Sequence, residues 1–101
     1  MEYSLFTQSV INVIKQIPKG KVIAFGEVAR RAGNPKAARQ VVRILHSLSE
    51  KFELPWHRVI NSQGKIGLHD PVGFELQKAR LEQENVVVST EGKIDIKKYG
   101  W

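Results

Sequence analysis

Cysteine is absent from the 101 residues of the chain. This absence excludes disulfide bonds, catalysis by a thiolate, and zinc sites built with cysteine ligands. The three histidines, His46, His57 and His69, are far apart in the sequence and form no close ligand pair of the HExxH kind. We therefore expect neither a metal site nor a cofactor.

Long apolar runs and acidic residues are also scarce. No apolar run approaches the length of a membrane span, and the N-terminus lacks the pattern of a signal peptide, so we expect a soluble, cytoplasmic protein with no membrane partner. Sixteen basic residues against ten acidic ones give a net charge of +6. Such an excess on a small domain favours a polyanionic partner, usually nucleic acid.

The length and the apolar pattern predict a single α+β domain over residues 1–101, because the chain shows no repeat, linker or low-complexity segment. In its first half, a helix is predicted over 4–17, capped by Ser4. A short extended segment at 21–25 and a short helix over 27–32 follow. A turn then leads into a longer helix over 35–49, with Pro35 in its first turn.

The second half of the chain predicts shorter elements. Residues 57–61 and 65–68 flank a turn and predict a small hairpin. A loop is expected at 70–73, a helix from 74 to 85, and an extended segment at 85–90. Whether the tail from Asp95 to Trp101 pairs with another segment or frays stays open.

The helix predicted over 35–49 has two different sides. At about 100° per residue, its apolar side should face the core and its basic side should face solvent. The apolar side comprises Ala38, Val41, Val42 and Leu45, and the basic side comprises Lys36, Arg39 and Arg43. A short helix, a turn and a basic-faced helix are typical of a helix-turn-helix, although an ordinary solvated amphipathic helix has the same pattern.

Five motifs occur in order along the chain: GKVIAFGEVA, AGNPKAARQV, PWHRVI, SQGKIG and LEQEN. In this combination the chain resembles the DNA-binding domain of the O6-alkylguanine-DNA alkyltransferases, from about residue 4 to residue 88. Those enzymes carry PCHR, in which the cysteine accepts the alkyl group, whereas this chain has Trp56. The PWHR sequence identifies it as similar to the alkyltransferase-like proteins. The resemblance implies a winged helix-turn-helix-like fold.

The resemblance also implies a lesion pocket without a nucleophile. Transfer of an alkyl group needs a soft thiolate, and the indole of Trp56 can only bind an alkyl group or a base. Beside Trp56, the pocket is expected to involve Pro55, together with His57 and Glu84 as the remainder of the enzymes' relay. The loop from Leu68 to Gly73 is expected to close over the base. In that loop His69 occupies a region where relatives often have arginine.

The DNA-binding roles follow from the same resemblance. Arg39 corresponds to a finger that fills the gap left by an extruded nucleotide. Phe25 occupies the position of a tyrosine that turns the 3′ phosphate, and it lacks the hydroxyl. The remaining expected DNA contacts are the small residues Ala37 and Ala38, which allow close approach to the minor groove, and the phosphate ligands Lys36 and Arg43.

The comparison with the alkyltransferase family bears on two further positions, Leu48 and Arg58. Leu48 falls where the enzymes have a hinge asparagine, so that brace is missing. Arg58 is expected to be structural, tying its segment to neighbouring carbonyl groups.

Three functions fit these residues. The first is a non-enzymatic, monomeric sensor that binds duplex DNA, flips O6-alkylguanine without removing the alkyl group, and marks it for nucleotide excision repair proteins. The second is an atypical dealkylase in which His57 and Glu84 activate water. The third is a winged-helix regulator that reads a DNA sequence without preferring a lesion. Preference for a lesion over a sequence separates the first function from the third.

Overall fold

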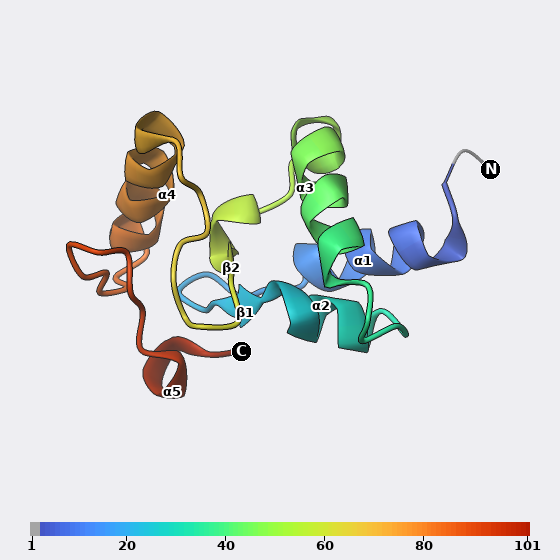
Figure 1. Cartoon of the computed structure of the whole chain (residues 1–101), viewed down its shortest axis with the longest axis horizontal. Coiled ribbons are helices and arrows are strands. Elements are labelled where there is room, and N and C mark those ends of the chain that lie inside the picture. The colour runs from blue at the N-terminus through green and yellow to red at the C-terminus, as the bar shows by residue number, and fades with distance from the viewer. Residues whose placement is uncertain (1–2) are drawn as a thin grey trace.

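The computed structural model describes residues 3–101, and the regular elements lie along the chain as short helices around a small sheet (Figure 1). In chain order they are α1 Leu5–Lys15, β1 Ile23–Ala24, α2 Phe25–Arg31, α3 Ala38–Phe52, the 3-10 turn η1 Trp56–Arg58, β2 Val59–Ile60, α4 Pro71–Gln83 and α5 Ile96–Tyr99. The predicted α+β class is confirmed. No helix among the described residues is long and apolar enough to cross a bilayer.

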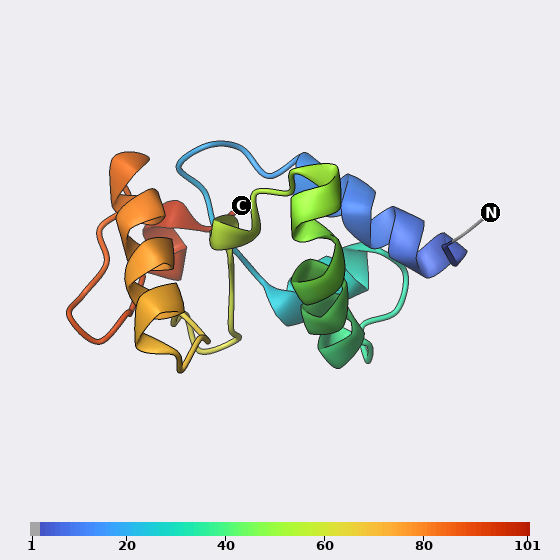
Figure 2. The ribbon, with the colours of Figure 1, turned by 90° about the horizontal axis from the view of Figure 1, so that it is seen from above.

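The two-stranded sheet divides the hydrophobic core into two parts. β1 and β2 run parallel, with Ile23 opposite Val59. Because successive side chains of a strand point to opposite faces, Ile23 and Val59 pack with α1, α2 and α3, whereas Val22 and Ile60 pack with α4 and the segment after it. Both ribbon views show these two groups of elements on either side of the sheet (Figures 1 and 2). The sheet therefore holds the two halves of the domain together.

α1 forms as the sequence predicts, with shorter bounds. The Ser4 hydroxyl accepts a hydrogen bond from the Thr7 backbone N–H at 3.1 Å, which confirms the predicted cap. Val10 and Ile14 are fully buried on its apolar face. The helix ends at Lys15, because the N–H groups of Gln16 and Ile17 already make the tighter bonds of a turn.

The helix-turn-helix consists of α2 and α3. α2 begins at Phe25, two residues earlier than predicted. α3 begins at Ala38 rather than Pro35, because Asn34 organises a turn: its side-chain oxygen accepts from the Lys36 N–H at 3.1 Å, and its carbonyl accepts from the Ala37 N–H at 3.1 Å. Pro35 is therefore part of this turn.

The predicted hairpin over 57–61 and 65–68 is wrong. Residues 56–58 form the 3-10 turn, and β2 pairs with β1 instead of with residues 65–68. The reason is burial: in the parallel pair Val59 and Ile60 are both inaccessible, one in each half of the core. Lys65 closes a tight loop onto Asn61 and then bridges antiparallel to Lys93.

In the last third of the chain, α4 begins earlier than predicted and the C-terminal tail pairs with another segment. α4 already includes residues 71–73 of the predicted loop, since Asp70 accepts from the Gly73 N–H at 3.0 Å and proline suits a first helical position. The tail pairs rather than frays: Val22 donates to the Tyr99 carbonyl and accepts from the Trp101 N–H, both at 2.9 Å. Residues 86–89 belong to no strand.

Candidate nucleic-acid interface

α3 presents its basic residues to solvent, as predicted. Arg39 and Arg43 are exposed on the helix, and Lys36 is exposed in the turn that precedes it. Ala37 and Ala38, at the helix start, are half-buried, and their small side chains protrude little from the surface beside the basic side chains. The candidate interface thus combines exposed cationic side chains with a start of the helix whose small side chains allow close approach.

The apolar side of α3 differs from the prediction at one position. Val41, Ile44 and Leu45 are its buried residues, whereas Val42 is 44% exposed. Ile44 takes the core position expected for Val42, because the helix is turned so that Val42 faces a cavity. α3 therefore has three different sides: one packs in the core, one faces solvent and one lines the cavity.

That cavity has a volume of about 970 Å³ and lies between α3, η1 and the start of α4. Trp56 and Phe25 both line it, so the structure brings together these two predicted site residues. The remaining lining residues come from α3 and the two residues after it, from the segment around β2, from the loop into α4 and from α4 itself: Val42, Leu45, His46, Ser49, Glu50, Glu53, Leu54, Val59, Asn61, Gly67, Leu68, Asp70, Gly73, Gln77 and Arg80. An indole and a phenyl ring in one open cavity can receive a planar base.

The other predicted pocket residues do not line the cavity. His69 is exposed, although its neighbours Leu68 and Asp70 line the cavity wall. Pro55 is half-buried immediately before η1. His57 and Glu84 lie behind Trp56 in the protein interior, and the imidazole contacts the indole edge-on at a centroid distance of 6.2 Å.

His57, Arg58 and Glu84 form a buried network. The Glu84 carboxylate lies 2.7 Å from His57 Nε2 and accepts from Arg58 Nη2 at 2.7 Å and from the Gly20 N–H at 3.0 Å. Arg58 also donates to the Ile17 carbonyl at 2.9 Å, which confirms its predicted structural role. The network ties η1 to the segment after α1 and to the end of α4.

The network fixes the charge states of its members. Burial raises the pKa of the Glu84 carboxyl, but the hydrogen bonds from Arg58, Gly20 and His57 outweigh burial and lower that pKa to about 2. Burial lowers the pKa of His57, against the opposing effect of Glu84. His57 is therefore neutral at pH 7, so its Nε2–H donates to Glu84 and its buried Nδ1 has no hydrogen-bond partner among residues 3–101.

Two α4 residues of the site were missed in the sequence. The buried Gln77 side chain donates to the carbonyl groups of His57 and Val59, at 3.0 and 3.1 Å, and so fixes η1 in place. The Arg80 guanidinium lies 5.3 Å from the centre of the Trp56 ring. Their spacing of three residues puts them on one side of a helix. That spacing is the only signal in the sequence, because the side that faces η1 is set by tertiary packing.

Leu48 packs against the core cluster shared by α1, α2 and α3. At this position, where the enzymes have an asparagine brace, the side chain therefore makes an apolar contact instead. Within residues 3–101, no group of three or more histidine, aspartate or glutamate side chains is placed to hold a metal ion.

Comparison with known proteins gives a consistent set of relatives. Residues 5–86 match the family described as 6-O-methylguanine DNA methyltransferase, DNA binding domain. The chain is 50% identical over 96 residues to the DNA base-flipping protein of Vibrio parahaemolyticus, covering 95% of each protein. It is 40% identical over 106 residues to alkyltransferase-like protein 1 of Schizosaccharomyces pombe, covering all of this chain and 98% of that protein.

Solved structures agree with these relatives. The crystal structure of S. pombe Atl1 in complex with damaged DNA containing O6-carboxymethylguanine matches with a TM-score of 0.85 at 40% identity, covering all of this chain and 98% of that one. The Mycobacterium tuberculosis O6-methylguanine methyltransferase matches with a TM-score of 0.66 at 27% identity, covering 97% of this chain and 56% of that one. The fold is thus shared with a protein crystallised on damaged DNA and with an enzyme.

Proposed function

The chain belongs to the family of the 6-O-methylguanine DNA methyltransferase DNA-binding domain and, within it, to the alkyltransferase-like proteins, and from this premise we propose that it is a sensor of alkylated DNA. It binds duplex DNA that contains O6-alkylguanine and turns the damaged nucleotide into the cavity beside Trp56. The alkyl group stays on the base. The protein acts as a monomer in the cytoplasm, or on the nucleoid in a bacterium.

The observation that carries this proposal is the position of the cavity beside the basic helix. α3 bears Arg39 and Arg43 on its exposed side and lines the cavity with Val42 and His46. A protein that holds the phosphate backbone along α3 therefore has an open, partly aromatic cavity within reach of the same helix. This arrangement supports extrusion of a base from the stack, which costs less for a damaged base than for a normal one.

The family resemblance implies roles for individual residues, and their placement supports these roles. Arg39, exposed in the first turn of α3, enters the duplex and occupies the space of the extruded nucleotide. Phe25 lines the cavity and has no hydroxyl, so it acts on the nucleotide by steric contact alone. Lys36 and Arg43 neutralise phosphates and set the salt dependence of binding.

Chemistry at this site stops at binding. The chain has no cysteine, and the indole nitrogen of Trp56 is not a nucleophile, because its lone pair is delocalised into the ring. The placement of His57 also opposes a water-using dealkylase. Its Nε2 faces Glu84, and the residue does not line the cavity in which an alkyl group would lie.

A protein that binds a lesion without removing it repairs nothing by itself. We therefore propose that the bound complex passes the lesion to nucleotide excision repair proteins. On this proposal, loss of the protein raises sensitivity to alkylating agents only in cells with active excision repair.

Base flipping is the step to test directly. A duplex is prepared with a fluorescent adenine analogue next to one O6-methylguanine, so that its emission rises when the lesion leaves the stack. We expect the wild-type protein to raise the emission on the damaged duplex and not on the matched undamaged duplex. Lys19→Ala, at an exposed position outside α3 and the cavity, is the control and should behave as wild type. Equal emission from both duplexes would contradict the proposal.

A further inference from the structure

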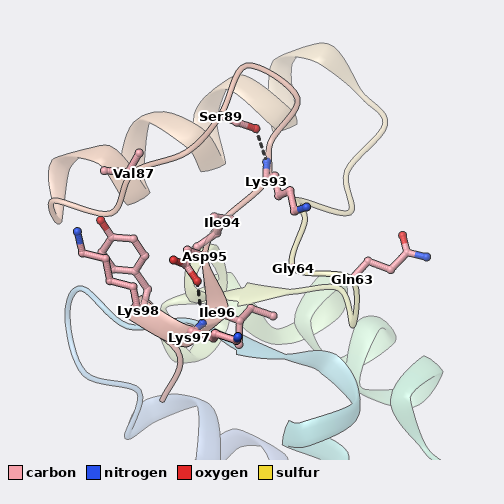
Figure 3. Close-up of a pocket in the computed structure, with 11 residues that line it drawn as sticks. Gln63, Gly64, Val87, Ser89, Lys93, Ile94, Asp95, Ile96, Lys97 and Lys98 are labelled. Carbon is pink, nitrogen blue, oxygen red and sulfur yellow. Dashed lines mark hydrogen bonds between the residues drawn. The ribbon is translucent and has the colours of Figure 1, made fainter.

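A second groove lies beside α5, apart from the lesion cavity. We call it the α5 groove. It has a volume of about 710 Å³ and shares no lining residue with the cavity. α5 lies below the β1–β2 sheet, whereas α3 and α4 rise above it (Figure 1). The groove is lined by Gln63, Gly64, Val87, Ser89, Lys93, Ile94, Asp95, Ile96, Lys97, Lys98 and Tyr99 (Figure 3).

The charge of the α5 groove is positive. Lys93, Lys97 and Lys98 are exposed, and none of them forms an ion pair within residues 3–101. Asp95 is the one acidic residue of the lining, and its carboxylate accepts from the Lys97 backbone N–H at 3.0 Å as the cap of α5 (Figure 3). Three lysines against one carboxylate leave the groove complementary to an acidic ligand.

The groove also offers apolar contact. Val87 is 67% exposed and Ile96 is 43% exposed, and both line it. In Figure 3 the Val87 side chain lies across the groove from the end that carries Lys97 and Ile96. The ligand should therefore carry apolar side chains in addition to negative charge, since water is then displaced from Val87 and Ile96.

The main chain along one wall is free to pair. Burial alternates from Val86 to Val88, with Val87 exposed between two buried neighbours. The backbone N–H and C=O groups of Val87, which point to one side of an extended segment, make no hydrogen bond within the described part of the chain. Such an unpaired edge can accept an added peptide strand.

We propose that the α5 groove binds an acidic peptide of a partner protein in an extended conformation. Its backbone pairs with Val87, its apolar side chains contact Val87 and Ile96, and its carboxylates lie near the three lysines. A DNA backbone fits less well, because its phosphates gain nothing from exposed Val87 and Ile96 and have no donor for the free Val87 carbonyl group. This site is separate from the lesion cavity, so both ligands bind together.

The test uses a fluorescein-labelled ten-residue peptide of alternating glutamate and valine, and a matched peptide of lysine and valine. Fluorescence anisotropy should show binding of the acidic peptide alone. Lys97→Glu should weaken it about fivefold, because reversal replaces an attraction with a repulsion worth about 1 kcal/mol together. Lys19→Glu makes the same charge change outside the groove and should leave binding unchanged. Hydrogen exchange at the Val87 amide should slow when the peptide is bound.

Three results would overturn the proposal. The first is absence of acidic-peptide binding by the wild-type protein. The second is equal weakening by Lys97→Glu and Lys19→Glu, which would mean attraction to net charge only. The third is binding without slower exchange at Val87. An undamaged duplex is titrated in parallel: a loss of DNA affinity in Lys97→Glu, with no peptide binding, would assign the groove to DNA instead.

Discussion

Replacing Glu84 by glutamine should destabilise the domain more than any other single change of a carboxylate to an amide among residues 3–101. Glutamine keeps the shape of the side chain, removes its charge and replaces one of its two acceptor oxygens with an NH2 donor, so Arg58 and His57 lose their charged acceptor. The Glu84 side chain is only 9% exposed, so water cannot replace the carboxylate. Breaking one partner of a buried ion pair costs about 3–5 kcal/mol.

The pKa of Glu84 gives a second measure of the same contribution. Its decrease from 4.5 to about 2 corresponds to about 3 kcal/mol of preference for the charged form in the folded state. Because the folded pKa lies below the unfolded one, this stabilisation is fully present above about pH 4.5 and is lost as the pH falls toward 2. The difference in stability between wild type and Glu84→Gln should therefore be about 3 kcal/mol at pH 7 and shrink toward zero near pH 2.

Urea denaturation followed by tryptophan fluorescence measures this difference. The matched control is Glu82→Gln, which removes an exposed carboxylate that pairs with Lys78 at 3.1 Å and lies in the last turn of α4, two residues before Glu84. That change should cost less than about 0.5 kcal/mol. Glu27, whose pKa is also lowered to about 2, mainly by its hydrogen bond from Arg30, titrates in every variant and cancels in the comparison. Equal effects of Glu84→Gln and Glu82→Gln would refute the account of the network.

Three further predictions concern the proposed interface. Trp56→Ala should reduce the preference for the damaged duplex about tenfold, since base–aromatic stacking is worth about 1–3 kcal/mol, while affinity for undamaged DNA stays nearly unchanged. Equal losses of affinity for both duplexes in a titration would argue against the cavity as the lesion site. Arg39→Ala should weaken binding to a paired lesion several-fold more than binding to the same lesion in an unpaired loop, and equal weakening would contradict a finger. Trp56→Cys should place a thiol beside the His57–Glu84 pair, and transfer of the methyl group to protein, followed with a labelled lesion, would show that the pair still activates a thiol. If the methyl group stays on the DNA, either the pair does not activate a thiol or the departures at Phe25, Leu48 and His69 prevent transfer.

The parts of the fold that follow from local chemistry were predictable. α1 has a regular apolar face and a serine cap, and its helix forms where the pattern places it. The basic side of α3 is likewise fixed by helical spacing, so Arg39 and Arg43 were assigned to solvent correctly. The position of Trp56 beside an open cavity agrees with its expected role in a pocket.

The parts that depend on contacts between distant residues were not predictable. β2 is two residues long and has no periodicity of its own, so its parallel partner β1 is decided by burial of Val59 and Ile60 in the two halves of the core. Gln77 and Arg80 belong to the site only because α4 packs with that side toward η1. Sequence spacing alone does not show which side of a helix faces a neighbour.

The central claim, that this protein recognises O6-alkylguanine without repairing it, is tested most directly by one titration with a chemical readout. A labelled duplex containing a single O6-methylguanine is titrated beside its undamaged counterpart, and the methyl group is then assayed after incubation. We predict tighter binding to the damaged duplex, with the methyl group still on the DNA. Equal binding to both duplexes, or loss of the methyl group from the base, would contradict it.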